Sequence, residues 1–382
     1  MKYWSYLLFV FLLFTTICSS CKQSTDSGQN APADSLIVGT TGNAGHDLFY
    51  NNYFGRYPTL DRGIRSLNFD GSGASFLFRK VYLYSSPRAS KMVFASKGTL
   101  YLADISGQSA EKLFTTGPDI QYAILSPDGE KVIYATLYNS TLGILGDSLN
   151  IYDIKTHSHT QLAAPNFRLL SGDLPAFSDD SKKIVLSFGN IHSSTDSLPL
   201  FMVNSDGTGL TQIASDITVN SFSEVSPYFW LPYSWSPDGK RICYEAPFSG
   251  LSKPDRLMIV DVATGITEKI SDTAYAPKWS PGGNFIAFTR DFPNSISHIA
   301  IFDVRTKQIR FIDPDAPYTG GAEVIDWTPD EHAVIVVANQ VDIKLDGSTL
   351  EIDAATGHTI TNYSFHDAMR VNIHRGKALG EH

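Results

Sequence analysis

The sequence predicts an all-β fold, a single β-propeller of four-stranded blades. Two observations predict it: a segment that joins a tight turn to an apolar strand occurs six times, and a strand-turn-strand hairpin follows five of the copies. No apolar period typical of a helix competes with these patterns in the repeated region. Repeats of this kind indicate a supersecondary unit whose apolar faces are covered only by neighbouring units.

The first half of each unit is the turn and the strand after it. The clearest copy is WSPDGKRICYE, which begins at Trp235. Pro suits the second position of a type I turn, Asp can accept local backbone hydrogen bonds, and Gly takes the position that needs a positive φ. The apolar, β-branched and aromatic run that follows is a strand signal. The turn Ser or Thr residues are spaced 40 to 58 residues apart, at Ser86, Ser126, Ser178, Ser236, Ser280 and Thr328.

The second half of each unit is a hairpin with an alternating strand, a turn rich in Asp, Thr and Gly, and another strand. Four short strands in a unit of this length are typical of a propeller blade. The hairpins begin at Leu149, Leu200, Leu257, Ile299 and Thr349.

A further hairpin begins at Gly63, before the first turn copy. With segments near Leu36 and Asp47 as inner strands, it predicts a seventh blade over residues 35–79. The alternative is six blades plus an N-terminal hairpin. The propeller is predicted to span residues 35–368, and residues 369–382 are a tail or a strand that closes the ring.

The N-terminal segment predicts export. Residues 1–20 resemble a lipoprotein signal peptide, with an apolar run too short to span a bilayer. Cys21 follows two serines and is the predicted lipidation site, whereas Cys18 follows Ile17, a poor match to a cleavage site for small residues. An ordinary signal peptide without a lipid is the alternative. Residues 21–34 are polar and predict a flexible tether, so we expect a lipid-anchored envelope protein on the periplasmic side of the outer membrane, with surface exposure left open.

Composition and motif searches mainly exclude functions. The net charge of −9, without a basic cluster, argues against nucleic acid as a partner. The sequence lacks a nucleophile elbow, a zinc-protease motif and a phosphate-binding glycine loop, so no catalytic residue, cofactor or metal site is predicted. With Cys21 acylated, only Cys243 remains in the mature chain, and it is predicted to be a small core residue.

Two features resemble metal motifs. His157 and His159 lie at a hairpin turn, where a solvated pair is the simpler interpretation. The segments NFDGSG from Asn68 and NSDGTG from Asn204 lack the third carboxylate and the terminal Glu of a calcium loop. We therefore expect both of them to be ordinary hairpin turns.

The candidate binding residues lie in the parts that do not repeat. In a blade, the first-to-second and third-to-fourth turns share one end, here named the turn face. The second-to-third loops and the links between blades share the other end, the loop face. Loops of the loop face are long and rich in aromatic and charged residues, which suit a contact surface. Tyr233 and Trp235 are predicted to be core, and about half of the other aromatics could cover their own blades. The candidates are Arg56, Tyr138, His192, Tyr228, Phe229, Trp230, Phe248, Lys253, Arg256, Arg290 and Asp291.

The WSPDGK pattern with its following hairpin resembles the TolB-type propeller repeat, over about residues 80–365. The motif residues are turn and core residues, so the resemblance is informative about fold more than function. It implies a binding module or scaffold for an envelope protein or peptide. The alternative is a carbohydrate-active enzyme resembling oligogalacturonate lyase, which needs several His around the axis. Only His192 lies in a loop of the loop face, so the sequence favours a protein without catalytic activity.

Overall fold

All described elements are β-strands, and all belong to the unit from Pro32 to His382. The predicted signal peptide, tether, Leu36 and Cys21 lie outside the described residues. No helix in the described part is long and apolar enough to cross a membrane. The computed structural model describes residues 48–52, 63–67, 75–79, 82–83, 89–96, 98–137, 146–162, 167–168, 174–187, 189–190, 199–214, 233–246, 256–292, 296–312, 322–328, 330–339, 347–353, 359–365 and 371–375.

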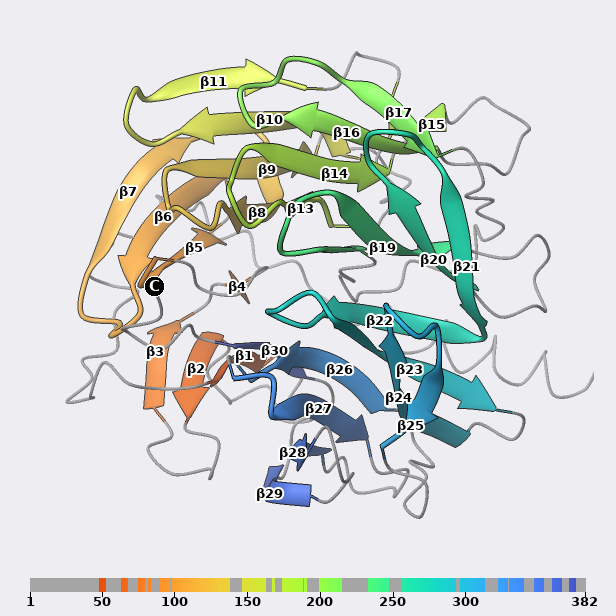
Figure 1. Ribbon diagram of the computed structural model, residues 1–382. Coiled ribbons are helices and arrows are strands. Elements are labelled where there is room, and N and C mark those ends of the chain that lie inside the picture. Colours follow the sequence, from red (N-terminus) through yellow and green to blue (C-terminus); the bar gives the residue numbers. More distant parts are fainter. Residues whose placement is uncertain are drawn as a thin grey trace, which may run out of the picture. The chain divides into compact units, whose positions relative to one another are not determined.

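The described strands form seven four-stranded antiparallel sheets, and six of these use strands in chain order (Figure 1). Each first strand pairs with the strand after its turn, as the repeats predicted. The first three of these sheets contain β4 (Tyr82–Leu83), β5 (Lys91–Ser96), β6 (Thr99–Asp104) and β7 (Ala110–Thr115); β8 (Asp119–Leu125), β9 (Lys131–Leu137), β10 (Gly146–Asp153) and β11 (Ser158–Gln161); and β13 (Ala176–Phe177), β14 (Lys183–Ser187), β16 (Leu200–Asn204) and β17 (Thr211–Ala214).

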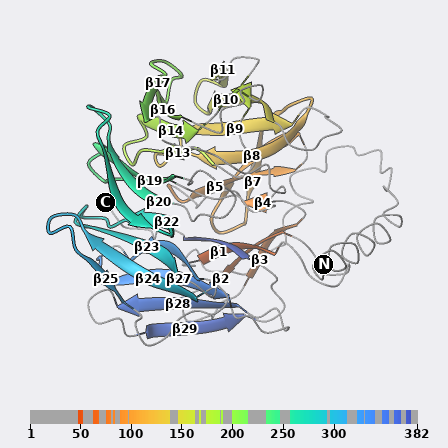
Figure 2. The same ribbon diagram turned by 90° about the vertical axis from the view of Figure 1, so that its right-hand side faces the viewer.

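The other three sheets with strands in chain order repeat this arrangement. Figure 2 shows the sheets β18–β21 and β22–β25 as neighbours. Their strands are β18 (Tyr233–Trp235), β19 (Arg241–Ala246), β20 (Arg256–Asp261) and β21 (Thr267–Asp272); β22 (Ala274–Trp279), β23 (Phe285–Phe292), β24 (Ile296–Asp303) and β25 (Ile309–Phe311); and β26 (Ala322–Trp327), β27 (Ala333–Asn339), β28 (Gly347–Asp353) and β29 (Thr359–Phe365).

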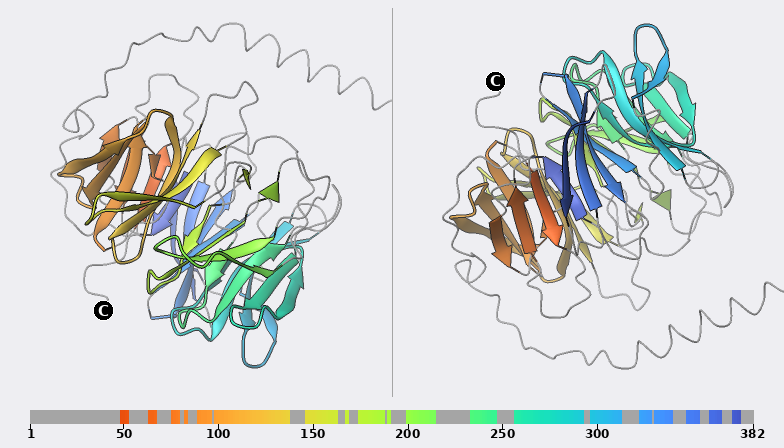
Figure 3. Two further views of the ribbon diagram at one scale, coloured as in Figure 1. Left: turned by 90° about the horizontal axis from the view of Figure 1, so that it is seen from above. Right: turned by 90° about the horizontal axis from the view of Figure 1, so that it is seen from below.

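The seventh sheet combines strands from distant parts of the sequence. Its order is β3-β2-β1-β30, with β1 (Leu48–Asn52), β2 (Gly63–Leu67), β3 (Ser75–Arg79) and β30 (Val371–Arg375). Strand β30 pairs antiparallel with β1, from Leu48 opposite Arg375 to Asn52 opposite Val371. Figure 3 shows these orange strands beside blue ones. Strand β30, from the segment predicted as a tail or closing strand, therefore takes the position that the first strand holds in the other sheets.

Neighbouring sheets pack face to face. In the core between β18–β21 and β22–β25, Cys243 and Leu257 lie against Trp279 and Phe288. Cys243 is fully buried, which confirms its predicted core position. Tyr233 and Trp235 are 4% and 6% exposed and belong to the core on the other side of β18–β21, as predicted. The last sheet, β26–β29, contacts β30, so the packing order returns to the first sheet.

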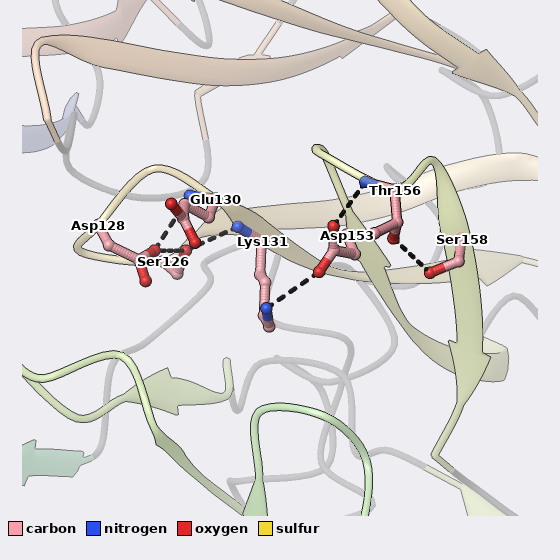
Figure 4. A network of polar contacts seen from close by, with 7 residues as sticks. All are labelled: Ser126, Asp128, Glu130, Lys131, Asp153, Thr156 and Ser158. Carbon is pink, nitrogen blue, oxygen red and sulfur yellow. Dashed lines mark hydrogen bonds and ion pairs between the residues drawn. The ribbon is translucent and has the colours of Figure 1, made fainter.

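The turn residues stabilise one end of each sheet through side-chain hydrogen bonds. Ser126 Oγ donates to Asp128 Oδ1 at 2.6 Å and accepts from the Lys131 amide at 2.9 Å. Lys131 Nζ then pairs with Asp153 Oδ2 at 3.1 Å, which joins the first turn of the sheet to its third-to-fourth turn (Figure 4). The two turns therefore lie at the same end, the turn face.

The turn tryptophans connect consecutive sheets. Trp235 Nε1 donates to the Ala176 carbonyl at 3.1 Å, and Trp327 Nε1 donates to the Lys278 carbonyl at 3.0 Å. Trp279 departs from this pattern: its backbone amide donates to Ser234 Oγ at 2.9 Å, and its Nε1 is buried without a hydrogen-bond partner in the described part of the chain. The Arg241 guanidinium lies 4.8 Å from the centroid of the Trp279 ring.

Candidate functional site

The structure describes three of the predicted binding residues. Arg256 is the first residue of β20, and Arg290 and Asp291 lie near the end of β23. All three are at the loop face, because the second-to-third loops join these strand ends. The other candidates lie outside the described residues: Arg56, Tyr138, His192, Tyr228, Phe229, Trp230, Phe248 and Lys253.

The two arginines lie on different sides of the β18–β21 sheet. Arg256 shares a strand face with Met258 and Val260, which pack towards β13–β17. Arg290 shares a strand face with Phe288, which packs against the opposite side of β18–β21. The structure therefore places both residues at the loop face but in two separate interfaces between sheets.

Arg290 is the centre of an aromatic cluster. Its guanidinium carbon lies 5.3 Å from the Phe292 ring centroid and 5.9 Å from that of Phe311. His298 lies opposite Arg290 in the β23–β24 ladder, and its ring is 5.3 Å from Phe292 and 5.7 Å from Phe311. The Phe292 and Phe311 rings are 5.7 Å apart. We name these four residues the rim cluster.

The rim cluster combines a cation with accessible apolar surface. Phe292 is 37% exposed, which makes it one of three large apolar side chains exposed in the described part of the chain. Arg290 is half-buried, and no hydrogen bond or ion pair joins its side chain to another described residue; its Nε is buried without a partner. The aromatic faces stabilise the guanidinium by cation–π attraction but do not neutralise its charge.

The nearby carboxylate of Glu245 already has a structural role. Its Oε1 accepts a hydrogen bond of 2.7 Å from the amide of Ala276, which joins β19 to the next sheet. Ala276 has φ of 53°, in the left-handed region, within a β-bulge of β22. Glu245 therefore holds an irregular part of the inner strand in place.

A small two-stranded ribbon adds to the loop face. Strand β12 (Phe167–Arg168) pairs with β15 (Gly189–Asn190) and lies outside the seven larger sheets. It joins a link between sheets to the start of a second-to-third loop, two residues before His192. Two loops that are separate in sequence are thus paired at the loop face.

Comparisons with known proteins give the fold. No protein-family model matches the chain. The tricorn protease aligns with a TM-score of 0.53 at 12% identity, over 82% of this chain and 33% of that chain. Dipeptidyl peptidase 4 of Porphyromonas gingivalis aligns with a TM-score of 0.52 at 10% identity, over 82% of this chain and 50% of that chain. The chain has a β-propeller fold.

Two further similarities involve bacterial proteins. TolB from Acinetobacter baumannii aligns with a TM-score of 0.49 at 14% identity, over 78% of this chain and 66% of that chain. Dipeptidyl-peptidase 5 of Porphyromonas gingivalis is 28% identical over 119 residues, which cover 28% of this chain and 17% of that protein. The matched part of this chain thus spans less than a fifth of this curated relative.

The histidine pair at the turn face of the propeller has partners that the sequence did not predict. His159 Nδ1 is 2.9 Å from the Tyr134 hydroxyl, and His157 Nδ1 is 2.8 Å from the Tyr152 hydroxyl. Phe114 packs on the His159 ring with centroids 4.7 Å apart. Burial raises the pKa of Tyr134 to about 12 and lowers the pKa of His159 below its usual range. Both imidazoles are exposed, but the prediction of a merely solvated pair was incomplete.

The described residues do not assemble a metal site. They contain no group of three His, Cys, Asp or Glu side chains that could hold an ion. In the NSDGTG segment, Asp206 Oδ1 accepts from the Thr208 amide at 2.9 Å, and Asn204 Nδ2 donates to Thr208 Oγ1 at the same distance. This segment is a hairpin turn, as predicted, whereas NFDGSG lies outside the described residues.

Sequence reasoning missed three members of the rim cluster: Phe292, His298 and Phe311. A signal existed for Phe292, because residues two apart on a strand share a face and Arg290 was already a candidate. His298 and Phe311 could be assigned to the rim cluster only from the register of β24 and β25, and the sequence does not determine that register.

Proposed function

We propose that this chain is a lipid-anchored β-propeller of the cell envelope that binds a protein or peptide through its loop face. The rim cluster carries the proposal. Exposed aromatic surface around an arginine is the composition that protein-binding sites favour over the rest of a protein surface. The aromatic loops that the sequence predicts for this face would extend the contact area.

Other features support a peptide or protein ligand. The partial sequence match to a dipeptidyl-peptidase is a match to a protein that acts on peptides. The repeated Ser or Thr side chains of the turn face donate to the Asp two residues later and accept from the amide five residues later, so these side chains already have structural contacts. The carbohydrate-active alternative rests on resemblance alone.

The binding proposal is tested by affinity capture from an envelope extract. The tagged full chain and an Arg290→Ala, Phe292→Ala double variant are the baits, with mass spectrometry of what they retain. Arg305→Ala is the matched control, because Arg305 is an exposed arginine in the β24–β25 turn of the same sheet, at the turn face. We expect a partner that wild type and Arg305→Ala retain and the double variant loses. Equal retention by all three baits would contradict binding through the rim cluster.

The anchor is tested separately. Metabolic labelling with a clickable fatty acid should mark the chain, and Cys21→Ala should abolish the label. A Cys18→Ala variant is the control, because this cysteine is predicted to be removed with the signal peptide. Equal labelling of the wild type and the Cys21→Ala variant would exclude Cys21 as the lipidation site.

A further inference from the structure

The rim cluster also indicates which chemistry the ligand presents. Within the described residues, Arg290 has aromatic neighbours and no carboxylate partner. A half-buried guanidinium in that setting keeps a full charge with less hydration than an exposed one, which is unfavourable unless an anion arrives. Among the described side chains, the rim cluster therefore has no negative charge that pairs with Arg290, and a ligand could supply one.

The geometry narrows the kind of anion. The guanidinium carbon of Arg290 lies over the Phe292 and Phe311 rings, and the planar fork of donors that it carries matches a carboxylate. Because Arg290 Nε is buried, the terminal nitrogens are the donors left for a ligand. The exposed Phe292 ring offers apolar contact beside them.

The ionisable groups around Arg290 are engaged in other contacts, so Arg290 is the one that can bind an anion of the ligand. On the facing sheet, Glu245 is bonded to the Ala276 amide, and Asp272 at the end of β21 pairs with Lys269 at 3.0 Å. On the sheet of Arg290 itself, His298 packs edge-on against both phenylalanine rings. Glu245 and Asp272 thus have a hydrogen bond and an ion pair, whereas the contacts of the Arg290 guanidinium among the described residues are with aromatic rings.

We propose that Arg290, Phe292 and Phe311 form an anchor for an acidic side chain of a peptide, with an apolar residue of the peptide next to it on Phe292. This inference rests on the proposed function and names the ligand chemistry of the same site. Arg290 supplies the charge and the donor fork, and the two rings orient it and give apolar contact.

The test is a selection from a random peptide library of twelve residues displayed on phage, using the full chain as the target. We expect enriched peptides to share an Asp or Glu beside an apolar residue. In binding measurements with synthetic copies, replacement of that acid by its amide should weaken binding to the unaltered protein about ten- to a hundred-fold, the value of a charge-assisted hydrogen bond. This arm does not depend on any protein variant folding.

Protein variants then locate the contact. Arg290→Met should weaken binding as much as the acid-to-amide change does, and the two changes together should cost no more than either one. Arg290→Lys should retain part of the affinity, because the charge remains without the fork. Arg305→Met is the control and should bind as the wild type does, and thermal unfolding of each variant checks its fold.

Four results would overturn the anchor. Enriched peptides without an acidic residue, or equal binding of acid and amide peptides, would leave a peptide-binding propeller whose anchor is not Arg290. If Arg290→Met and the acid-to-amide change weaken binding additively, the acidic side chain of the peptide contacts another part of the protein. An unenriched library would also exclude the anchor, while the capture experiment would still decide whether a folded protein is the partner.

Discussion

The indole of Trp327 donates a hydrogen bond of 3.0 Å to the backbone carbonyl of Lys278, in the inner strand of the preceding sheet. The donor side chain is 1% exposed, so water cannot readily replace the bond. Trp235 makes the same contact to Ala176. These tryptophans therefore stabilise the packing of one sheet on the next as well as filling the core.

Trp327→Phe should lower the free energy of unfolding by about 1 to 3 kcal/mol, because it removes a buried donor and leaves the Lys278 carbonyl without it. Denaturant titration followed by circular dichroism measures the change. Trp279→Phe is the matched control, since the Trp279 Nε1 has no hydrogen-bond partner among the described residues. The proposed role of the bond is wrong if the two substitutions cost the same.

Acid should destabilise the propeller through its turn aspartates. The amide of Thr156 is the main cause that lowers the pKa of Asp153 to about 2, and Lys131 adds to it. A carboxyl whose folded pKa is lowered contributes stability above its unfolded pKa, near 3.8, and loses that contribution as the pH falls towards 2. Asp153→Asn should therefore narrow the stability difference between pH 6 and pH 2.5, measured by urea unfolding.

Lys131→Met separates the two causes at Asp153. The Thr156 hydrogen bond of 2.8 Å remains in this variant. Most of the stability difference between pH 6 and pH 2.5 that is due to Asp153 should then persist. If Lys131→Met reduces this difference as much as Asp153→Asn does, the ion pair and not the Thr156 hydrogen bond is the main cause.

His159 should make the free energy of unfolding depend on pH in a range above that of Asp153. Partial burial lowers its pKa in the folded state, so the unfolded chain binds the proton more readily. The contribution of neutral His159 is present above its unfolded pKa, about 6.5, and is lost as the pH falls through the lower folded value. His159→Gln should remove this component from a stability profile between pH 8 and pH 5.

Tyr134→Phe is the companion variant for His159, because it removes the hydroxyl that contacts Nδ1 at 2.9 Å and keeps the ring against Phe114. If burial is the cause of the shift, NMR titration of the His159 imidazole should still give a lowered pKa in this variant. A return to the ordinary value would show that the hydroxyl contact is responsible.

The Cys243 thiol should be inert in the folded protein. It is fully buried, and burial raises its pKa well above the usual value, so little thiolate forms and reagents cannot reach it. Alkylation with iodoacetamide, read by mass spectrometry of the peptide that contains Cys243, should occur only in denaturant. Rapid alkylation under native conditions would show that the β19 strand opens.

The repeat turns predicted much of the fold because their chemistry is local. The Ser236 hydroxyl bonds Asp238 two residues away and the Arg241 amide five residues away, so a short segment specifies the turn and the start of β19. The same contacts recur from Ser178 and Thr328. The alternation of apolar residues then predicted the strands.

Long-range pairing explains what the sequence did not predict. Phe311 reaches the rim cluster only because β25 pairs with β24 so that Phe311 lies opposite Ala300. His159 meets Tyr134 and Phe114 because three strands of two sheets converge there. Both sets of contacts depend on the register between strands that loops of variable length join, and local sequence does not encode it.

The pairing of β30 with β1 has a consequence for biosynthesis. A ribosome makes β1 before every other described strand and β30 after all of them. Until β30 has been synthesised, one edge of β1 has no partner in this sheet and is open to mispairing. A nascent chain stalled before Val371 would therefore need a holding chaperone, whereas the completed chain supplies that protection from its own last strand.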